Sequence, residues 1–163
     1  MKHSMDAATA NFIERMGLVH EADGLPRIAG RIFGLLLISE GARSLDDLAC
    51  ELRVSKGSVS TNARLLEQRG ILERICRPGD RRDYYRVPPD LFTHTMGQRL
   101  ARWQRFHEVI GAARTTLRIQ SPEVLERLEE YEAAYAFMSK VIGDALARWR
   151  AGRNRAALVG SSR

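Results

Sequence analysis

The stretch Ser44 to Gly70 reads S-L-D-D-L-A-C-E-L-R-V-S-K-G-S-V-S-T-N-A-R-L-L-E-Q-R-G and predicts two short helices. Ser44, followed by two carboxylates, is a capping-box-like start, and Ser55 is a second N-cap. One face of each helix is apolar: Leu45, Leu48, Ala49 and Leu52 in the first, Val59, Ala63 and Leu66 in the second. Only Arg53-Val54 separates the helices, so the stretch predicts a helix-turn-helix.

The segment that follows, Arg74 to Val87, reads R-I-C-R-P-G-D-R-R-D-Y-Y-R-V and predicts a hairpin. Pro78-Gly79-Asp80 is strong turn chemistry, and residues that favour extended backbone stand on both sides of it. The tip carries three arginines, Arg77, Arg81 and Arg82. A helix-turn-helix followed by a hairpin predicts a winged helix, and the charge at its tip favours a polyanion opposite it.

The charge of the whole chain favours the same partner. Its 163 residues include 26 basic and 20 acidic ones, a formal net charge of +6. Nine basic residues and four acidic ones lie between Arg53 and Arg86, and five basic residues and no acidic one between Arg148 and Arg163. We therefore expect double-stranded DNA as a partner.

The second helix has the composition that a recognition helix needs to enter the major groove. If its apolar stripe faces inward, Gly57, Thr61 and Arg64 point directly outward, and Asn62 lies near the boundary. Small residues let the helix lie close to DNA, and basic or amide side chains reach phosphates or base edges. The residues that we predict to contact DNA are Ser55, Lys56, Gly57, Ser58, Ser60, Thr61, Asn62, Arg64, Arg77, Arg81 and Arg82.

The last helix, introduced by Ser121-Pro122-Glu123, carries a long apolar seam. Its members are spaced alternately by four and three residues: Val124, Leu128, Tyr131, Tyr135, Met138, Ile142, Ala145 and Trp149. Such a seam faces a partner helix, either the preceding helix from Phe92 to Leu117 or a second copy of the chain. We favour the second copy, and predict dimer contacts at Phe12, Leu128, Tyr131, Tyr135, Met138, Ile142 and Trp149.

These elements predict a mainly α fold with a small β-hairpin: a winged helix-turn-helix with N- and C-terminal dimerisation helices. Residues 1–25 form an N-terminal arm or dimerisation helix, 26–90 the DNA-binding domain, 91–150 a C-terminal helical dimerisation region, and 151–163 a basic flexible tail. Within the DNA-binding domain, a helix from Pro26 to about Glu40 carries Gly30 and Gly34 on one face, which predicts close packing against another helix.

Other kinds of site find little support in the sequence. No glycine-rich phosphate loop, nucleophile elbow or pair of catalytic carboxylates stands out, so we expect neither an enzyme nor a cofactor. The histidines lack zinc-ligand spacing, so we expect no metal. The two cysteines, Cys50 and Cys76, are predicted to be structural thiols, and together with the absence of a signal core or membrane span they predict a cytoplasmic protein.

The chain resembles the MarR-type winged-helix regulators, and among them the GbsR-like branch. The motifs that carry the resemblance are G-L-P-R-I-A-G-R-I-F-G-L-L-L (24–37), S-L-D-D-L-A (44–49), V-S-K-G-S-V-S-T-N-A-R (54–64), L-E-Q-R-G-I-L (66–72) and R-P-G-D-R-R-D-Y-Y (77–85). The resemblance implies a homodimer that binds a palindromic operator, a small effector that binds between the two regions, and repression by blocking polymerase. It assigns no effector-binding residue here.

The sequence leaves two functions open besides that of a sequence-specific transcriptional regulator. A sequence-tolerant architectural protein would bind operator and random DNA with similar affinity. A winged helix used for protein assembly would not require a small, polar recognition helix together with a basic wing.

Overall fold

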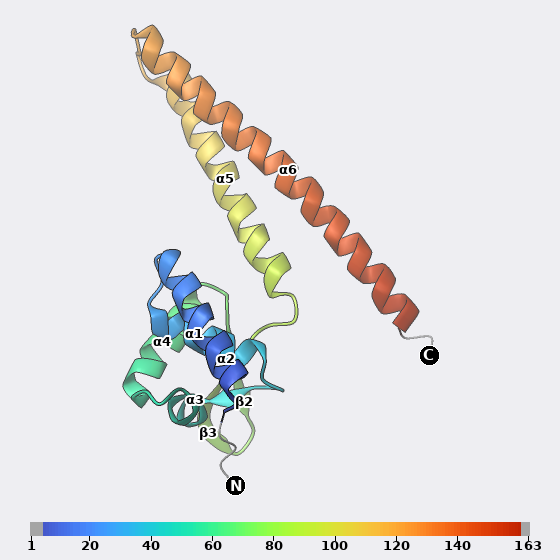
Figure 1. Ribbon diagram of the computed structural model, residues 1–163. Helices are drawn as coiled ribbons and strands as arrows, with labels where there is room; N and C mark the ends of the chain where they lie inside the picture. The colour runs from blue at the N-terminus through green and yellow to red at the C-terminus, as the bar shows by residue number, and fades with distance from the viewer. Residues whose placement is uncertain (1–4, 161–163) are drawn as a thin grey trace. The chain divides into compact units, whose positions relative to one another are not determined.

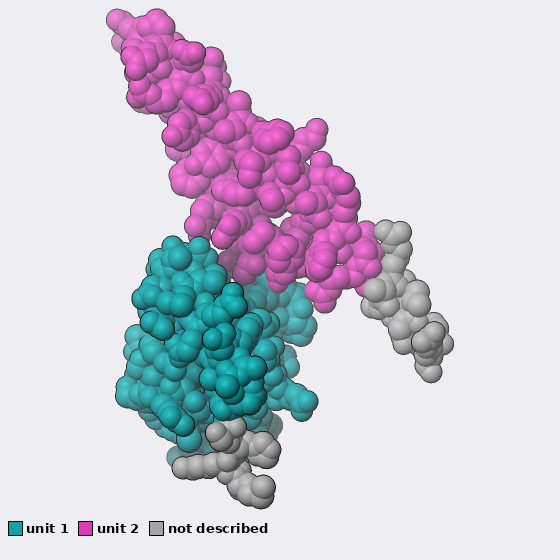
Figure 2. Space-filling model, viewed as in Figure 1, with its two compact units in different colours: residues 1–91 teal, residues 92–163 magenta. Residues whose placement is uncertain are grey.

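A computed structural model describes residues 5–160 of the chain, with side chains as far as residue 153. The chain divides into two compact units, residues 1–91 and 92–163 (Figure 2). Most of the structure is helical, with one small antiparallel sheet in the first unit (Figure 1). The mainly α winged-helix fold that the sequence predicts is confirmed.

The first unit begins with two helices, α1 (Ala7–Ala22) and α2 (Arg27–Leu37), which pack closely through glycines. A Cβ atom added to Gly30 would lie 2.6 Å from the carbonyl oxygen of Met16, and one added to Gly34 would lie 2.9 Å from the Met16 Cβ. The predicted small-residue face is therefore confirmed as a helix contact. Helix α2 is shorter than predicted: Pro26 is its N-cap rather than its first residue, and it ends at Leu37.

The helix-turn-helix consists of α3 (Leu45–Leu52) and α4 (Lys56–Gln68). The capping box at Ser44 is present, because its hydroxyl accepts from the backbone nitrogen of Asp47 while the Asp47 carboxylate accepts from Ser44. Arg53 ends α3 in the left-handed conformation, with φ 54°. This conformation reverses the chain over very few residues, and Ser55 then begins α4.

The sheet has three strands in the order β1-β3-β2: β1 (Arg43–Ser44), β2 (Glu73–Arg77) and β3 (Asp80–Arg86). The hairpin predicted around Pro78-Gly79-Asp80 is the β2-β3 pair, and Gly79 has the positive φ that its turn requires. The two-residue strand β1 was not predicted. The hairpin is anchored in the protein because Tyr85 of β3 belongs to the core that the helices of this unit share.

The second unit is a helical hairpin of α5 (Leu91–Thr116) and α6 (Pro122–Gly160). The helices run antiparallel: Phe92 contacts Trp149, and farther along Phe106 stacks on Tyr135 with ring centroids 5.1 Å apart. Helix α6 continues to Gly160, beyond the end near Arg150 that the sequence suggested. Of the tail predicted to be flexible, residues 161–163 lie outside the described residues.

None of the helices described between residues 5 and 160 combines the length and apolarity that a bilayer-spanning segment needs.

Candidate nucleic-acid interface

Helix α4 separates a buried face from an outward face, as its sequence predicts. Val59, Ala63 and Leu66 are fully buried in the core. The predicted outward residues are exposed or half-buried: Ser55, Lys56, Gly57, Thr61 and Arg64 are exposed, and Ser58 and Ser60 are half-buried. A Cβ atom added to Gly57 would meet no atom of the described chain within 4 Å. Packing within the described chain therefore does not require glycine at this position, and the open space leaves room for a partner.

Asn62 departs from the predicted DNA-contacting set. Its side chain is only 9% exposed, and its Nδ2 donates a hydrogen bond to the carbonyl oxygen of Ser58, one turn earlier in the same helix. The buried amide is thus directed along α4 rather than away from it. This placement argues against the base contact that we expected of Asn62, and we leave it out of the proposed interface.

Lys56, at the start of α4, is held by an acidic residue of α3. Its Nζ lies 2.8 Å from a carboxylate oxygen of Asp46, and both side chains are exposed. An exposed ion pair of this kind contributes little stability and exchanges readily for another anion. The pair therefore joins the two helices of the helix-turn-helix and keeps a basic group at the positive end of α4, where phosphate oxygens are favoured.

The wing contains a connected network around Asp80. The carboxylate accepts hydrogen bonds from the Arg82 guanidinium, at 3.0 Å from Nε and 2.6 Å from Nη2, and from the Tyr84 hydroxyl at 2.7 Å. The hydrogen bonds from Arg82 hold the pKa of Asp80 well below its usual range, and the same pair raises the pKa of Arg82. Asp80 thus fixes the direction of an exposed arginine.

The other two wing arginines have different surroundings. The Arg77 guanidinium carbon lies 3.9 Å from the centroid of the Tyr84 ring, a cation-π contact, and its Nη2 donates to the carbonyl oxygen of Ala42 at 3.4 Å. The Arg81 side chain is exposed and makes no hydrogen bond or ion pair with the part of the chain that the structure describes. The wing therefore offers one arginine oriented by a carboxylate, one stacked on an aromatic ring and one unrestrained.

The wing is tied to the recognition helix by its second tyrosine. Tyr85 is buried in the core, and its hydroxyl donates to Glu67 of α4 at 3.4 Å. Burial raises the pKa of Tyr85, so its hydroxyl stays protonated and able to donate at neutral pH. Arg74 of β2 pairs with the same glutamate at 3.5 Å. These contacts join the wing to α4 within one hydrophobic core.

Sequence reasoning missed Tyr84, which organises two of the three wing arginines. The signal was available: residues 80, 82 and 84 alternate along a strand and so share one face of it. Cys50 and Cys76, which the sequence predicts to be structural thiols, are both free and exposed, and Cys76 lies next to the wing turn. No cluster of three or more metal-ligating side chains occurs among the described residues.

Comparison with known proteins identifies the family. A MarR family model matches residues 23–83, and a model described as MmpR5-like MarR family transcriptional regulator matches residues 90–153. The HTH-type transcriptional regulator MmpR5 of Mycobacterium tuberculosis is 37% identical over 139 residues, which cover 85% of this chain and 84% of that protein. This chain belongs to the MarR family.

Two further transcriptional regulators are similar to this chain. The putative HTH-type transcriptional regulator YvaV of Bacillus subtilis is 25% identical over 154 residues, covering 85% of this chain and 87% of that protein. A crystal structure of a transcriptional regulator matches with a TM-score of 0.76 at 35% identity, covering 88% of this chain and 98% of that one. As a MarR protein, the chain is a DNA-binding transcriptional regulator and not an enzyme.

Proposed function

We propose that this MarR protein is a ligand-responsive repressor that binds a palindromic operator as a homodimer. Two recognition helices related by a twofold axis would read the two half-sites, and a dimer covering a promoter would block polymerase. The motifs between Gly24 and Tyr85 further support placement in the GbsR-like branch. The homodimer is the part of the proposal with the most direct structural support.

The observation that carries the proposal is the lack of a core in the second unit. Among its described side chains only Leu146 is buried, at 5% exposure, and α5 buries none. Nine large hydrophobic residues of this unit are exposed: Phe92, Phe106, Val109, Leu117, Tyr131, Phe137, Met138, Val141 and Trp149. So much exposed apolar surface on two long helices is characteristic of a protein interface.

The seam predicted on α6 divides into two lines. Leu128, Tyr135 and Ile142 are half-buried, and Tyr135 stacks on Phe106 of α5. Tyr131, Met138 and Trp149 are more open, at 55%, 39% and 49% exposure. The first line therefore fits packing within the hairpin, the alternative that the sequence left open. Of the second line, Trp149 also contacts Phe92 of α5, and Tyr131 and Met138 fit contact with another copy.

In the first unit, α1 offers a different contact from the one expected. Phe12 packs against the core, whereas Leu18 and Val19 near the end of the helix are about half exposed. We therefore propose Leu18 and Val19, rather than Phe12, as the apolar contribution of α1 to a dimer.

For DNA, we propose that α4 enters the major groove and the wing contacts the adjacent minor groove. Gly57 and Thr61 allow close approach, Arg64 reaches base edges, and Lys56 with the α4 hydroxyls holds phosphates. At the wing, Arg82 in the direction fixed by Asp80 is suited to the negative potential of a narrow minor groove. Arg77 and Arg81 add phosphate contacts on either side of it.

Sedimentation equilibrium tests the homodimer. Tyr131→Glu and Met138→Glu would bury a carboxylate in the proposed interface and should weaken dimerisation by about 2 kcal/mol or more, roughly thirtyfold in Kd. Both side chains are exposed within one chain, so helix content by circular dichroism should not change. Lys140→Glu, exposed on the opposite side of α6, is the matched control. A wild-type monomer at micromolar concentration, or an equal effect of Lys140→Glu, would refute the proposed interface.

A further inference from the structure

The helical hairpin of the second unit separates its charges along its length. The stacking of Phe106 on Tyr135 divides it into a closed half, residues 106–135, and an open half, residues 91–105 and 136–153. The closed half has six acidic and three basic residues. The open half has one acidic residue, Asp144, and seven exposed basic ones: Arg99, Arg102, Arg105, Lys140, Arg148, Arg150 and Arg153. The open half is therefore a basic surface separate from α4 and the wing.

In the closed half, carboxylates already hold two of the three arginines. Arg114 lies 2.6 Å from an oxygen of Glu129 and also pairs with Glu132. Arg127 lies 2.8 Å from an oxygen of Glu123. Three of the six acidic residues in this half are thus paired with a cation as well. The closed half keeps little charge with which to attract a partner.

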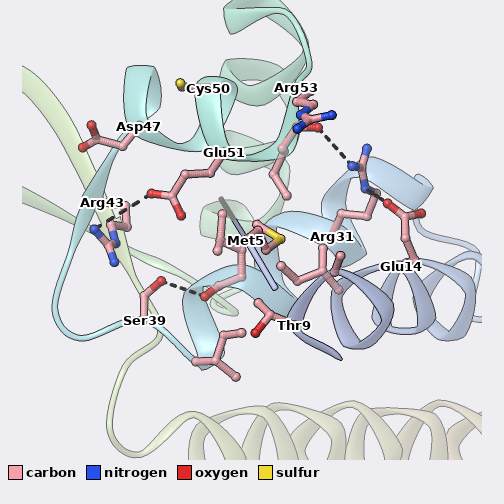
Figure 3. A pocket seen from close by; sticks show the side chains of 15 residues that line it. Met5, Thr9, Glu14, Arg31, Ser39, Arg43, Asp47, Cys50, Glu51 and Arg53 are labelled. Carbon is pink, nitrogen blue, oxygen red and sulfur yellow. Dashed lines mark hydrogen bonds and ion pairs between the residues drawn. The ribbon is translucent and has the colours of Figure 1, made fainter. Parts of the chain in front are cut away.

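The first unit shows the same pairing in a cleft lined by α1, α2, β1 and α3. Arg31 lies 2.6 Å from a carboxylate oxygen of Glu14, and Arg43 lies 3.9 Å from one of Glu51 (Figure 3). The side chains of both arginines are turned toward acidic residues of the same unit. Arginines held in this way offer less to an external anion than unpaired guanidinium groups do.

The arginines of the open half have no such partners. Five exposed arginine side chains form no hydrogen bond or ion pair with the described part of the chain: Arg99, Arg102, Arg105, Arg148 and Arg150. The three on α5 follow one another at intervals of three residues, so they are neighbours on the helix surface. The two on α6 flank Trp149, which contacts Phe92 near the start of α5. Five unpaired guanidinium groups at one end of a hairpin are suited to a polyanion.

Double-stranded DNA is the polyanion that fits this surface best. It carries one negative charge for about every 1.7 Å of its axis, and the protein belongs to a DNA-binding family. The chain also enters the open half directly from the wing, because only residues 87–90 lie between β3 and α5. The acidic half of a second copy is a weaker candidate, since half of its carboxylates are already paired.

We infer that the open half of the α5-α6 hairpin binds phosphates of the DNA that flanks the operator, chiefly through Arg99, Arg102 and Arg105. The position of this contact rests on the proposed function, because only an operator defines a flank. Phosphates carry no sequence information, so the contact adds affinity and salt dependence without base preference.

The test measures binding to two duplexes by fluorescence anisotropy over a salt series. One duplex contains only the two half-sites of an operator selected from random DNA, and the other extends it on each side by about 10 base pairs of unrelated sequence, one helical turn. The open-half variant removes three charges from exposed side chains: Arg99→Gln, Arg102→Gln and Arg105→Gln. The matched control removes three charges from exposed side chains elsewhere: Arg15→Gln, Arg118→Gln and Arg127→Gln.

We expect the longer duplex to steepen the wild-type slope of log K against log salt concentration by about 1.8 or more, which is at least one phosphate contact for each protomer of a dimer. The open-half variant should lose this increase and bind the short duplex as the wild type does. The control variant should keep the increase. Comparison on the same pair of duplexes cancels the effect of duplex length itself.

Three results would overturn the inference. The first is a wild-type slope that does not depend on duplex length, and the second is an equal loss of slope in the two triple variants. The third is a weaker dimer in sedimentation equilibrium together with equally weaker binding of both duplexes by the open-half variant, which would place the surface against a second copy.

Failure of the proposed function gives a different result. Equal affinity for the operator and for a scrambled duplex of the same length would refute the proposed reading of an operator. A lower salt slope of the open-half variant on the long scrambled duplex, with the control variant unchanged, would still show that the open half binds phosphates.

Discussion

Replacement of Arg82 by alanine tests the wing most informatively, because the structure shows what the change leaves behind. The guanidinium is exposed but held by two of its nitrogens on Asp80. In Arg82→Ala the carboxylate stays, still accepting from Tyr84 but without its cation. Each wing then loses a positive group and presents an uncompensated negative one. We expect weaker binding to every duplex, with most of the base preference retained, because base edges are read by α4.

The salt dependence of DNA binding gives the size of the affinity loss expected for Arg82→Ala. Each phosphate contact contributes about −0.9 to the slope of log K against log salt concentration. A rise from about 50 to 200 mM salt is a change of about 0.6 in the logarithm, so one lost contact is worth about 3.5-fold in affinity over this interval, and the two wings of a dimer together about twelvefold. The deficit of Arg82→Ala relative to wild type should therefore shrink by about this factor between the two salt concentrations.

Fluorescence anisotropy on an operator, a scrambled duplex and a salt series measures these quantities. Arg127→Ala on α6 removes the same charge from another part of the chain and should leave the slope unchanged. Asp80→Asn combined with Arg82→Ala should recover part of the affinity, since it removes the uncompensated carboxylate. Arg64→Ala should instead cost about 1 to 3 kcal/mol and flatten discrimination between the operator and its single-base variants. Unchanged affinity and salt slope in Arg82→Ala would show that the wing does not contact DNA.

Three further changes test the architecture beneath the interface. Gly57→Ala adds a methyl group into open space on a helix, so thermal unfolding should show equal stability or a gain of up to about 1 kcal/mol. Fluorescence anisotropy should show weaker DNA binding. Unchanged DNA affinity would argue against close approach of α4 to DNA. Gly30→Ala forces a Cβ against the backbone of α1 and should destabilise the first unit by about 1 to 3 kcal/mol in urea unfolding. No change in the unfolding free energy would contradict the tight contact between α1 and α2. Ser44→Ala removes a buried N-cap and should lower the unfolding free energy by about 0.5 to 2 kcal/mol at pH 7. The hydrogen bond from Ser44 lowers the pKa of Asp47 below its usual 3.8. Its contribution to stability is therefore fully present above the usual pKa and is lost as the pH falls through the lowered pKa of the folded protein. The difference in unfolding free energy between variant and wild type should narrow in acid, and a difference that does not change with pH would refute the charge-assisted box.

The parts of the fold that the sequence predicted are those with a local cause. A cap such as Ser44, a turn such as Pro78-Gly79-Asp80 and the buried stripe of α4 each depend on residues a few positions apart. Strand β1 has no such cause, because it pairs Arg43 and Ser44 with Tyr85 and Tyr84, about forty residues later in the chain. Its two residues carry no alternating pattern that would reveal a strand.

The candidate site was predictable as a set of residues but not as a network. A helical projection places Asn62 near the edge of the outward face, and only its bond to Ser58 shows that the amide faces the helix. Similarly, the α6 sequence predicts an apolar seam but does not show which of its residues α5 covers. The covered residues depend on the contact of Phe106 with Tyr135, which fixes the two helices relative to each other.

The central claim is that a dimer reads two half-sites of double-stranded DNA through α4 and the wing. Selection from a pool of random duplexes, followed by sequencing of the bound fraction, tests this claim on every possible operator at once. We predict enrichment of a palindrome whose half-sites lie one helical turn apart, about 10 base pairs from centre to centre, or a multiple of that spacing. Arg64→Ala should lose preference at defined positions of each half-site. A bound fraction with the same base composition and symmetry as the input pool would contradict the account.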